Sequence, residues 1–463
     1  MVCHASPRKR DKREEEIMAA DTIAALATPA GRGGIAIVRI SGSRVHHVIS
    51  EILGCKLTPR QATYLSFRDA EGEMIDEGVA IFFPHPHSFT GEDVLELQGH
   101  GGLVVVDLLL QRILSLGVSL ARPGEFSERA FLNGKIDLTQ AEAVADLINA
   151  ASKQAARSAI RSLQGEFSRE IHRLNEKIIH LRMYVEAAID FTDEEIDFLG
   201  DEKIATALKI ILDDLMIIQR KAQQGSFLRE GITAVIVGEP NVGKSSLLNC
   251  LSGKDVAIVT DIPGTTRDVL RDYILIDGMP MHIIDTAGLR DSDDIVEQEG
   301  IRRAYNEIEK ADIVLHVIDA NKKESSSVNF KTISHPQPII SIRNKIDLTQ
   351  ESPSIMHHND NVVISLSAKS GAGIDLLKSH VKTQIGFHSS EEGCFLANSR
   401  QRDALVRTQS HVKDSIKQLS HSRSGELAAE DLRQAHLALC EITGEFTTDD
   451  LLSRIFSSFC IGK

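Results

Sequence analysis

The feature that most constrains this chain is the run Gly-Glu-Pro-Asn-Val-Gly-Lys-Ser at residues 238–245. It follows an apolar run at 232–237, typical of a buried strand, and precedes Ser-Leu-Leu-Asn, typical of a helix start. A glycine-rich turn with a chance lysine is the alternative, but the strand–loop–helix context favours a loop whose backbone N–H groups surround phosphates. In such a loop Lys244 reaches the β- and γ-phosphates, and the Ser245 hydroxyl suits Mg²⁺.

Three later motifs each follow a predicted strand, at 281–285, 339–342 and 362–366. Asp285, at a strand end, can hold Mg²⁺ through water, and the Gly288 N–H can contact the γ-phosphate. The Asp347 carboxylate of Asn-Lys-Ile-Asp can accept both N–H groups of guanine, a pair that adenine does not offer. The Ala368 N–H of Ser-Ala-Lys can donate to guanine O6. Asn-Lys-x-Asp alone would indicate a polar turn, but the order of the motifs predicts GTP.

The chain is expected to be a multidomain α/β and α protein. Residues 1–18 are charged and lack an apolar segment, which indicates a disordered tail and not a signal peptide; a start at Met18 is equally possible. Residues 19–134 mix strands with a helix, which predicts an α+β domain. Residues 135–228 and 389–463 have helical periodicity, and 229–388 alternate strand and helix. We therefore expect a P-loop domain inserted into a helical bundle.

Composition limits the function. The chain of 463 residues has a formal net charge of −14 and no tryptophan, so an RNA substrate would need a local basic patch or a partner protein. Its six cysteines are scattered without metal-ligand spacing, which indicates reduced thiols in a cytoplasmic protein. No apolar run is long enough to span a membrane.

The run Thr-Asp-Ile-Pro-Gly-Thr-Thr-Arg-Asp at 260–268, together with the motifs above, resembles the TrmE–Era group of GTPases. The resemblance implies that Thr266 offers its hydroxyl to Mg²⁺. Leu289 stands where many small GTPases carry a water-orienting glutamine, so hydrolysis needs another device. The expected nucleotide-binding residues are Asn241, Val242, Gly243, Lys244, Ser245, Ser246, Thr260, Asp261, Ile262, Pro263, Gly264, Thr265, Thr266, Asp285, Thr286, Ala287, Gly288, Asn344, Lys345, Ile346, Asp347, Ser367, Ala368 and Lys369.

The C-terminal Cys-Ile-Gly-Lys and motifs such as Gly-His-Gly-Gly at 99–102 closely resemble the MnmE (TrmE) family of tRNA modification GTPases. In that family the loop asparagine, here Asn241, helps to bind K⁺, which can neutralise developing charge as an arginine would. The alternative is that Asn241 only orders the loop. The other K⁺ ligands map onto Thr260, Ile262 and Thr265. A water-orienting glutamate maps onto Glu297, where a surface carboxylate would otherwise be expected.

The family also implies a homodimer that acts with MnmG, a flavin enzyme, and modifies carbon 5 of the wobble uridine of certain tRNAs with a carboxymethylaminomethyl or aminomethyl group. A tetrahydrofolate derivative donates the one-carbon unit. Its contacts map onto Arg39, Glu96, Lys135 and Lys463. Without the family, each would be interpreted as a solvated charge.

Cys460 is a candidate nucleophile for carbon 6 of a uracil, or a small buried hydrophobe beside Phe456 and Phe459. Two other functions stay open. One is a GTP-switched ribosome assembly factor of the Era kind, which would usually carry a basic RNA-binding module. The other is a regulator of MnmG that performs no chemistry itself.

Overall fold

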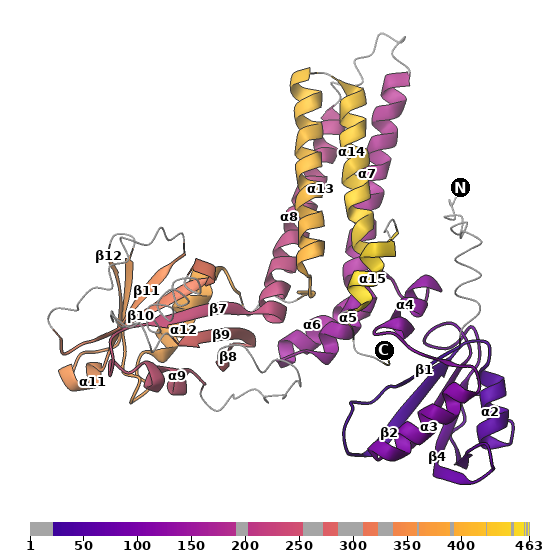
Figure 1. The fold of residues 1–463 in the computed structure, drawn as a ribbon. Helices are drawn as coiled ribbons and strands as arrows, with labels where there is room; N and C mark the ends of the chain where they lie inside the picture. Colours follow the sequence, from indigo (N-terminus) through magenta and orange to yellow (C-terminus); the bar gives the residue numbers. More distant parts are fainter. Residues whose placement is uncertain are drawn as a thin grey trace, which may run out of the picture. The chain divides into compact units, whose positions relative to one another are not determined.

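The computed structural model describes residues 22–190, 202–252, 272–285, 309–322, 337–358, 361–388, 393–422, 424–445, 449–457, 459 and 462. The chain divides into two compact units, Met1–Ala145 with Cys440–Lys463, and Asp146–Leu439 (Figure 1). In the described part of the chain, no helix is long and apolar enough to cross a membrane.

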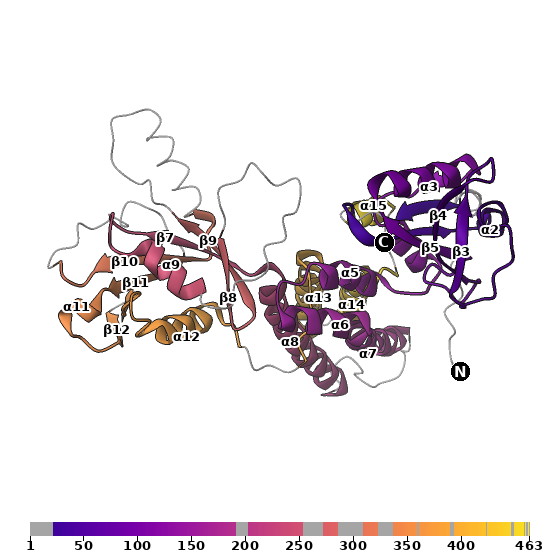
Figure 2. The ribbon, with the colours of Figure 1, turned by 90° about the horizontal axis from the view of Figure 1, so that it is seen from below.

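The first unit is built on a six-stranded sheet of order β3-β4-β5-β2-β1-β6, antiparallel except for the β1–β6 pair. Helices α2 and α3 cover one face of this sheet (Figure 2). In α2 the apolar residues Val45, Val48, Ile49 and Ile52 are buried because their spacing places them on one helix face. The strands are β1 (Ile23–Leu26), β2 (Gly33–Ser41), β3 (Thr63–Arg68), β4 (Met74–Phe83), β5 (Val94–Gly101) and β6 (Ser119–Leu120), and the helices are α2 (Val45–Leu53) and α3 (Leu103–Ser115).

The end of the chain packs within this unit against α4 (Glu125–Leu132) and the start of α5 (Leu138–Ile148). Leu452 and Phe456 of α15 (Asp449–Ser457) are buried in one cluster with Leu138. Gly124, just before α4, has φ of +68°, and a Cβ there would lie 2.5 Å from the carbonyl oxygen of Phe456. Only glycine therefore allows α4 and α15 to approach this closely.

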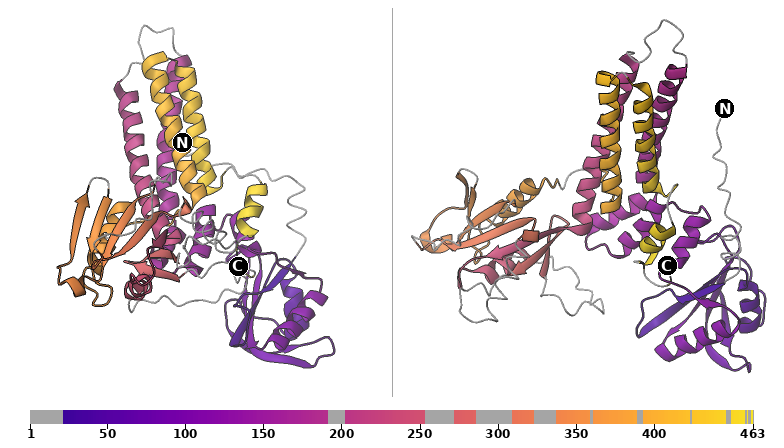
Figure 3. Two further views of the ribbon diagram at one scale, coloured as in Figure 1. Left: turned by 60° about the vertical axis from the view of Figure 1, so that its left-hand side comes forward. Right: turned by 45° about the horizontal axis from the view of Figure 1, so that its top comes forward.

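The second unit contains a helical bundle and a sheet. Four long helices lie side by side (Figures 1 and 3): α7 (Glu166–Asp190), α8 (Glu202–Glu230), α13 (Ser399–Lys417) and α14 (Gly425–Thr443). Polar contacts also join them, for example His436 Nδ1 on α14 at 2.7 Å from Asn175 Oδ1 on α7. Asn398 caps α13, because its side chain accepts from the Gln401 N–H while the Gln401 side chain accepts from the Asn398 N–H.

In the sequence, all strands of this sheet lie between α8 and α13 of the bundle, which confirms that the P-loop domain is inserted into the helical domain. Its order is β12-β13-β11-β10-β7-β9-β8, with only β8–β9 and β12–β13 antiparallel among the pairs described. The strands are β7 (Ile232–Val237), β8 (Asp272–Ile276), β9 (Met279–Asp285), β10 (Ile313–Asp319), β11 (Ile339–Asn344), β12 (Ser354–His358) and β13 (Asn361–Ser365), and the helices are α9 (Lys244–Ser252), α11 (Ile346–Thr349) and α12 (Ile374–Ile385).

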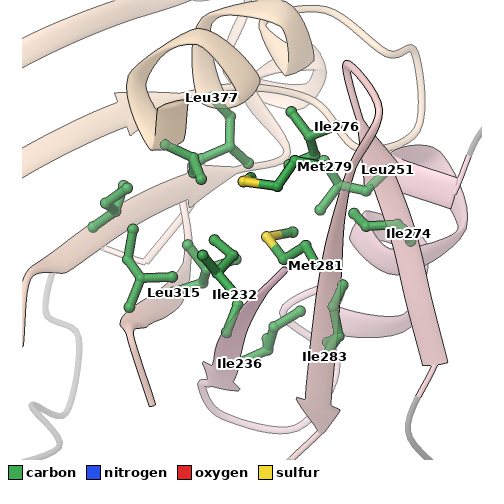
Figure 4. Packing of buried hydrophobic residues seen from close by; sticks show 14 of the residues in the cluster. Ile232, Ile236, Leu251, Ile274, Ile276, Met279, Met281, Ile283, Leu315 and Leu377 are labelled. Atoms are coloured by element: carbon green, nitrogen blue, oxygen red, sulfur yellow. The ribbon is translucent and has the colours of Figure 1, made fainter. Parts of the chain in front are cut away.

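Strand β7 shows why this is a layered domain. Ile232, Ala234 and Ile236 point into a large cluster on one face, and Val235 and Val237 into a smaller cluster on the other. The large cluster contains residues of the β8–β9 hairpin, of α9 and of α12, some of which are shown in Figure 4.

Helix α6 (Lys153–Leu163) belongs to the same core. Its Ala155 and Ala159 are buried in the large cluster with Ile276 and Met279 of the β8–β9 hairpin. At the turn of this hairpin, the position that a Cβ of Gly278 would occupy is filled by the side chain of Gln154. The hairpin turn therefore rests directly on α6.

Candidate functional site

The phosphate loop lies between β7 and α9. Gly243 has φ of +99°, and a Cβ there would collide with Asn344 Nδ2, so both backbone geometry and space require glycine. Lys244 opens α9, and its Nζ donates to the carbonyl oxygens of Gly238 at 2.7 Å and Glu239 at 3.2 Å. Ser245 follows on the first turn of the helix and is exposed. A helix start of this kind favours anions, as the sequence predicts.

Asn344, the last residue of β11, connects three loops. Its side chain is buried, its Nδ2 donates to the Val242 carbonyl at 2.8 Å, and its Oδ1 accepts from the Ala368 N–H at 2.9 Å. The carboxyl ends of β7, β11 and β13 are thereby tied together at one edge of the sheet. The predicted contact of the Ala368 N–H with guanine O6 would have to share this donor with Asn344.

Lys345 lies across the same edge. It adopts φ of +69°, and its Nζ donates to the Asn241 carbonyl and to Asp319 Oδ2, both at 2.7 Å. The hydrogen bond from Lys345 lowers the pKa of the Asp319 carboxyl, so Asp319 stays ionised. Asp319, the last residue of β10, was not a predicted site residue; its position at the end of a largely apolar strand was the available signal.

Asp347 is exposed on α11, and its Oδ1 accepts a 2.6 Å hydrogen bond from Ser367 Oγ. This bond holds the Asp347 carboxylate at the sheet edge where Asn344 and Lys345 lie. The carboxylate is exposed, so its remaining lone pairs can accept hydrogen bonds from a ligand. A carboxylate in this place can pair with the two N–H groups of a guanine.

A second group of predicted residues lies in the first unit. The Arg39 guanidinium on β2 donates to Glu96 Oε1 on β5 through Nε at 3.0 Å and Nη2 at 2.8 Å. Arg39 and Glu96 are directly opposite in the β2–β5 register, which explains why the pair forms. Arg39 Nη1 also lies 3.5 Å from the carbonyl oxygen of Gly462, so the end of the chain contacts the predicted site.

Two aromatic rings flank this arginine. The Arg39 guanidinium carbon lies 5.7 Å from the ring centre of Phe89 and 5.8 Å from that of Phe126. Phe126 is buried and Phe89 is partly exposed, at 38%. Neither was predicted as a site residue. Lys135 Nζ donates to the Pro86 carbonyl at 3.0 Å, so Arg39 and Lys135 both contact the loop that links β4 to β5.

A buried charge network supports that loop. Arg129 of α4 pairs with Glu92 at 3.2 Å and with Glu125 at 2.9 Å. Arg122 pairs with Glu128 at 2.9 Å, and burial raises the pKa of the Glu128 carboxyl. Removing one member of such a network would leave a buried charge unpaired, so the network holds the loop in one position.

Several predicted residues lie outside the described residues. They are Thr260, Asp261, Ile262, Pro263, Gly264, Thr265, Thr266, Thr286, Ala287, Gly288, Glu297, Cys460 and Lys463. Asp285 is the last residue of β9, at the same edge of the sheet as Asn344.

The doubly wound sheet, the phosphate loop before α9 and the oriented Asp347 define a P-loop GTPase with an added helical domain and N-terminal α+β domain. Family models match both added parts: the GTP-binding protein TrmE N-terminus at residues 22–135, and the MnmE helical domain at residues 138–460. The chain belongs to the MnmE family, also called TrmE.

Full-length relatives agree with this assignment. The tRNA modification GTPase MnmE of Vibrio cholerae serotype O1 is 57% identical over 453 residues, which is 96% of this chain and all of the relative. That of Coxiella burnetii is 56% identical over 448 residues, 96% of this chain and 99% of the relative. Among solved structures, the FeoB G domain of Methanococcus jannaschii matches 34% of this chain and 97% of its own, with 21% identity and a TM-score of 0.26.

Proposed function

We propose that this GTPase acts in the modification of the wobble uridine of tRNA. The observation that carries the proposal is the presence, in one chain, of a guanine-type nucleotide site around Asn344 and Asp347 and a separate arginine–glutamate–aromatic site around Arg39. Relatives that are 56–57% identical over nearly their full length are named tRNA modification GTPases.

The nucleotide site provides the energy-coupled step. Lys244 at the start of α9 would contact the β- and γ-phosphates, and Mg²⁺ held by the exposed Ser245 and by Thr266 would offset their charge. Asn241 is exposed in the phosphate loop with φ of +64°, so its side chain is available to a cation. K⁺ held by Asn241, Thr260, Ile262 and Thr265 would supply positive charge in place of an arginine, and Glu297 would orient the water.

The K⁺ proposal has a direct test. Wild-type GTP hydrolysis is measured in K⁺ and in Na⁺ at equal ionic strength, alongside Asn241→Ala and a control, Pro240→Ala, one residue away. We expect K⁺ to stimulate the wild type and the control but not Asn241→Ala. Equal rates in both salts for the wild type would refute K⁺ activation.

The N-terminal site suits a tetrahydrofolate derivative, which supplies a one-carbon unit when bound. The fixed Glu96 carboxylate can accept from the amidine-like edge of a pterin, and the partly exposed Phe89 offers a ring face beside Arg39. Lys135 and Lys463 would attract the glutamate tail. The contact between Arg39 Nη1 and the Gly462 carbonyl supports a role for the end of the chain at this site.

We also propose a cytoplasmic homodimer that works with MnmG. The exposed apolar side chains of the first unit include Ile35 at 68%, Leu103 at 57% and Val104 at 72%. Gly33 pairs with Gly101 in the β2–β5 register, so Ile35, near the start of β2, belongs to the same end of this strand pair as Leu103 and Val104, which come just after β5. An exposed apolar group of this kind is typical of a protein interface.

The test of the whole proposal is mass spectrometry of tRNA nucleosides from a deletion strain that carries wild type, Asp285→Asn, Cys460→Ser or the control Cys55→Ser. Cys55 is an exposed thiol in the same unit. We expect wild type and Cys55→Ser to restore carboxymethylaminomethyl or aminomethyl uridine, and Asp285→Asn to fail. Full activity of Cys460→Ser would assign Cys460 a structural role. Unmodified wobble uridine with wild type and MnmG present would favour the assembly-factor function.

A further inference from the structure

Helix α6 differs in charge from the rest of this acidic chain. The segment 147–165, which contains α6, has no aspartate or glutamate, although the whole chain has 66 acidic residues and a net charge of −14. It does contain Lys153, Arg157 and Arg161. These residues are spaced four apart, so all three lie on one face of the helix, about 12 Å from first to last.

The opposite face of α6 is buried. Ala155, Ser158, Ala159 and Ser162 pack into the second unit, whereas Lys153 and Arg157 are exposed and Arg161 is half-buried. The basic face is therefore directed away from the core and has no part in holding the fold.

None of these three cations has an ion pair or hydrogen bond to another described side chain. Cations elsewhere in the unit do, for example Arg229 with Asp146 at 2.6 Å and Arg182 with Glu186 at 2.8 Å. Arg169, at the start of α7, donates to the Gln164 carbonyl at 2.8 Å and adds a further exposed cation at the end of α6. Like charges four residues apart repel one another, so this face costs stability until an anion neutralises it.

We propose that the face formed by Lys153, Arg157, Arg161 and Arg169 binds the phosphate backbone of tRNA. The inference rests on the proposed function and states where that substrate docks. Arginine is suited to phosphate because its planar guanidinium donates two parallel hydrogen bonds. An acidic protein fits less well, since on α6 only Ile160, at 42% exposure, offers a large apolar contact, and protein interfaces usually have an apolar, aromatic-rich centre.

The test measures tRNA affinity by fluorescence anisotropy between 50 and 300 mM KCl. The test variant is Lys153→Gln, Arg157→Gln and Arg161→Gln combined. The matched control is Lys209→Gln, Arg220→Gln and Lys413→Gln, three exposed cations on α8 and α13 whose loss changes the net charge equally. Thermal unfolding of each variant checks that it folds.

We expect the α6 variant to bind tRNA roughly tenfold more weakly or worse at about 100 mM salt, and its slope of log K against log salt to fall by about 2 to 3, since each lost phosphate contact removes roughly 0.7 to 0.9. The control should keep the wild-type slope. Equal losses of affinity in both variants would show a bulk charge effect and overturn the inference. An unchanged salt slope in the α6 variant would also overturn it, and is the result expected if α6 binds an acidic protein. If wild type binds no tRNA even with MnmG present, the proposed function fails and the inference with it.

Discussion

Asn344→Ala tests the reasoning about the nucleotide site most directly. The substitution removes two hydrogen bonds, from Nδ2 to the Val242 carbonyl and from the Ala368 N–H to Oδ1. The side chains of Asn344, Val242 and Ala368 are at most 7% exposed, so water would not readily replace the lost partner. Leaving a buried donor or acceptor unpaired costs about 1 to 3 kcal/mol, hence about 2 to 6 kcal/mol for the two.

Both bonds join protein to protein, so the loss is expected in the free energy of unfolding as well as in GTP affinity. For a domain of this size, about 1 kcal/mol shifts Tm by roughly 2 to 4 °C, which gives a fall of roughly 4 to 24 °C. The assay is thermal unfolding followed by near-UV or intrinsic fluorescence signals, combined with titration of a fluorescent guanine nucleotide.

Ser367→Ala is the matched control. It removes the 2.6 Å hydrogen bond to Asp347 and the 3.3 Å hydrogen bond that Ser367 Oγ accepts from the Ser370 N–H. Asp347 and Ser370 are both exposed, so water can replace the lost partner. This variant should lose guanine affinity, with stability falling by about 1 kcal/mol or less. An Asn344→Ala protein that unfolds at the wild-type temperature would refute the argument that this side chain ties the three loops together.

Three further outcomes follow from the structure. Gly243→Ala should abolish nucleotide binding, because it places a Cβ at φ of +99° against Asn344; titration with labelled nucleotide would show it, and wild-type affinity would contradict it. The His100–Asp76 hydrogen bond raises the pKa of His100 and lowers that of Asp76. Its full contribution to the free energy of unfolding is therefore present at pH values between the ordinary pKa values of the two groups, near 4 and 6.5. This contribution is lost as pH rises through the raised His100 pKa or falls through the lowered Asp76 pKa. NMR titration of His100 measures the shift. An ordinary His100 pKa, or a His100 pKa that is the same in Asp76→Asn, would contradict the prediction. Gly124→Ala should weaken the packing of α15 on α4, seen as faster proteolysis of the C-terminus, and proteolysis at the wild-type rate would speak against that packing.

Local patterns predicted most of the elements. The run at 232–237 is β7, and the helical periodicity predicted across 135–228 corresponds to helices that include α6 and α7. Elements that were not predicted include α2, β3, β8 and β12. In β3 and β12 the apolar residues are few and interrupted by polar ones, and β8 is only five residues long, whereas the helical spacing of the apolar residues in α2 was an available signal. Edge strands such as β8 and β12 bury only part of their surface, which weakens the periodic signal.

Site residues that belong to contiguous motifs could be predicted, whereas those brought in by tertiary packing could not. Asn344 and Asp347 follow a strand in a recognisable run, but the bond from Lys345 to Asp319 joins two loops of different strands. The rings of Phe89 and Phe126 beside Arg39 likewise come from distant parts of the chain. No local pattern indicates such contacts.

The hairpin of β8 and β9 connects the predicted Mg²⁺-binding threonine to Asp285, and its turn rests on Gln154 of α6. A helix that touches this hairpin on one side and solvent on the other is a point of thermodynamic linkage. If exchange of GTP for GDP moves the turn and thereby changes the affinity of α6 for a ligand by some factor, that ligand must change the GTP/GDP preference by the same factor. The close fit of Gly278 against Gln154 would then couple the GTP/GDP exchange equilibrium to the binding of a ligand on α6.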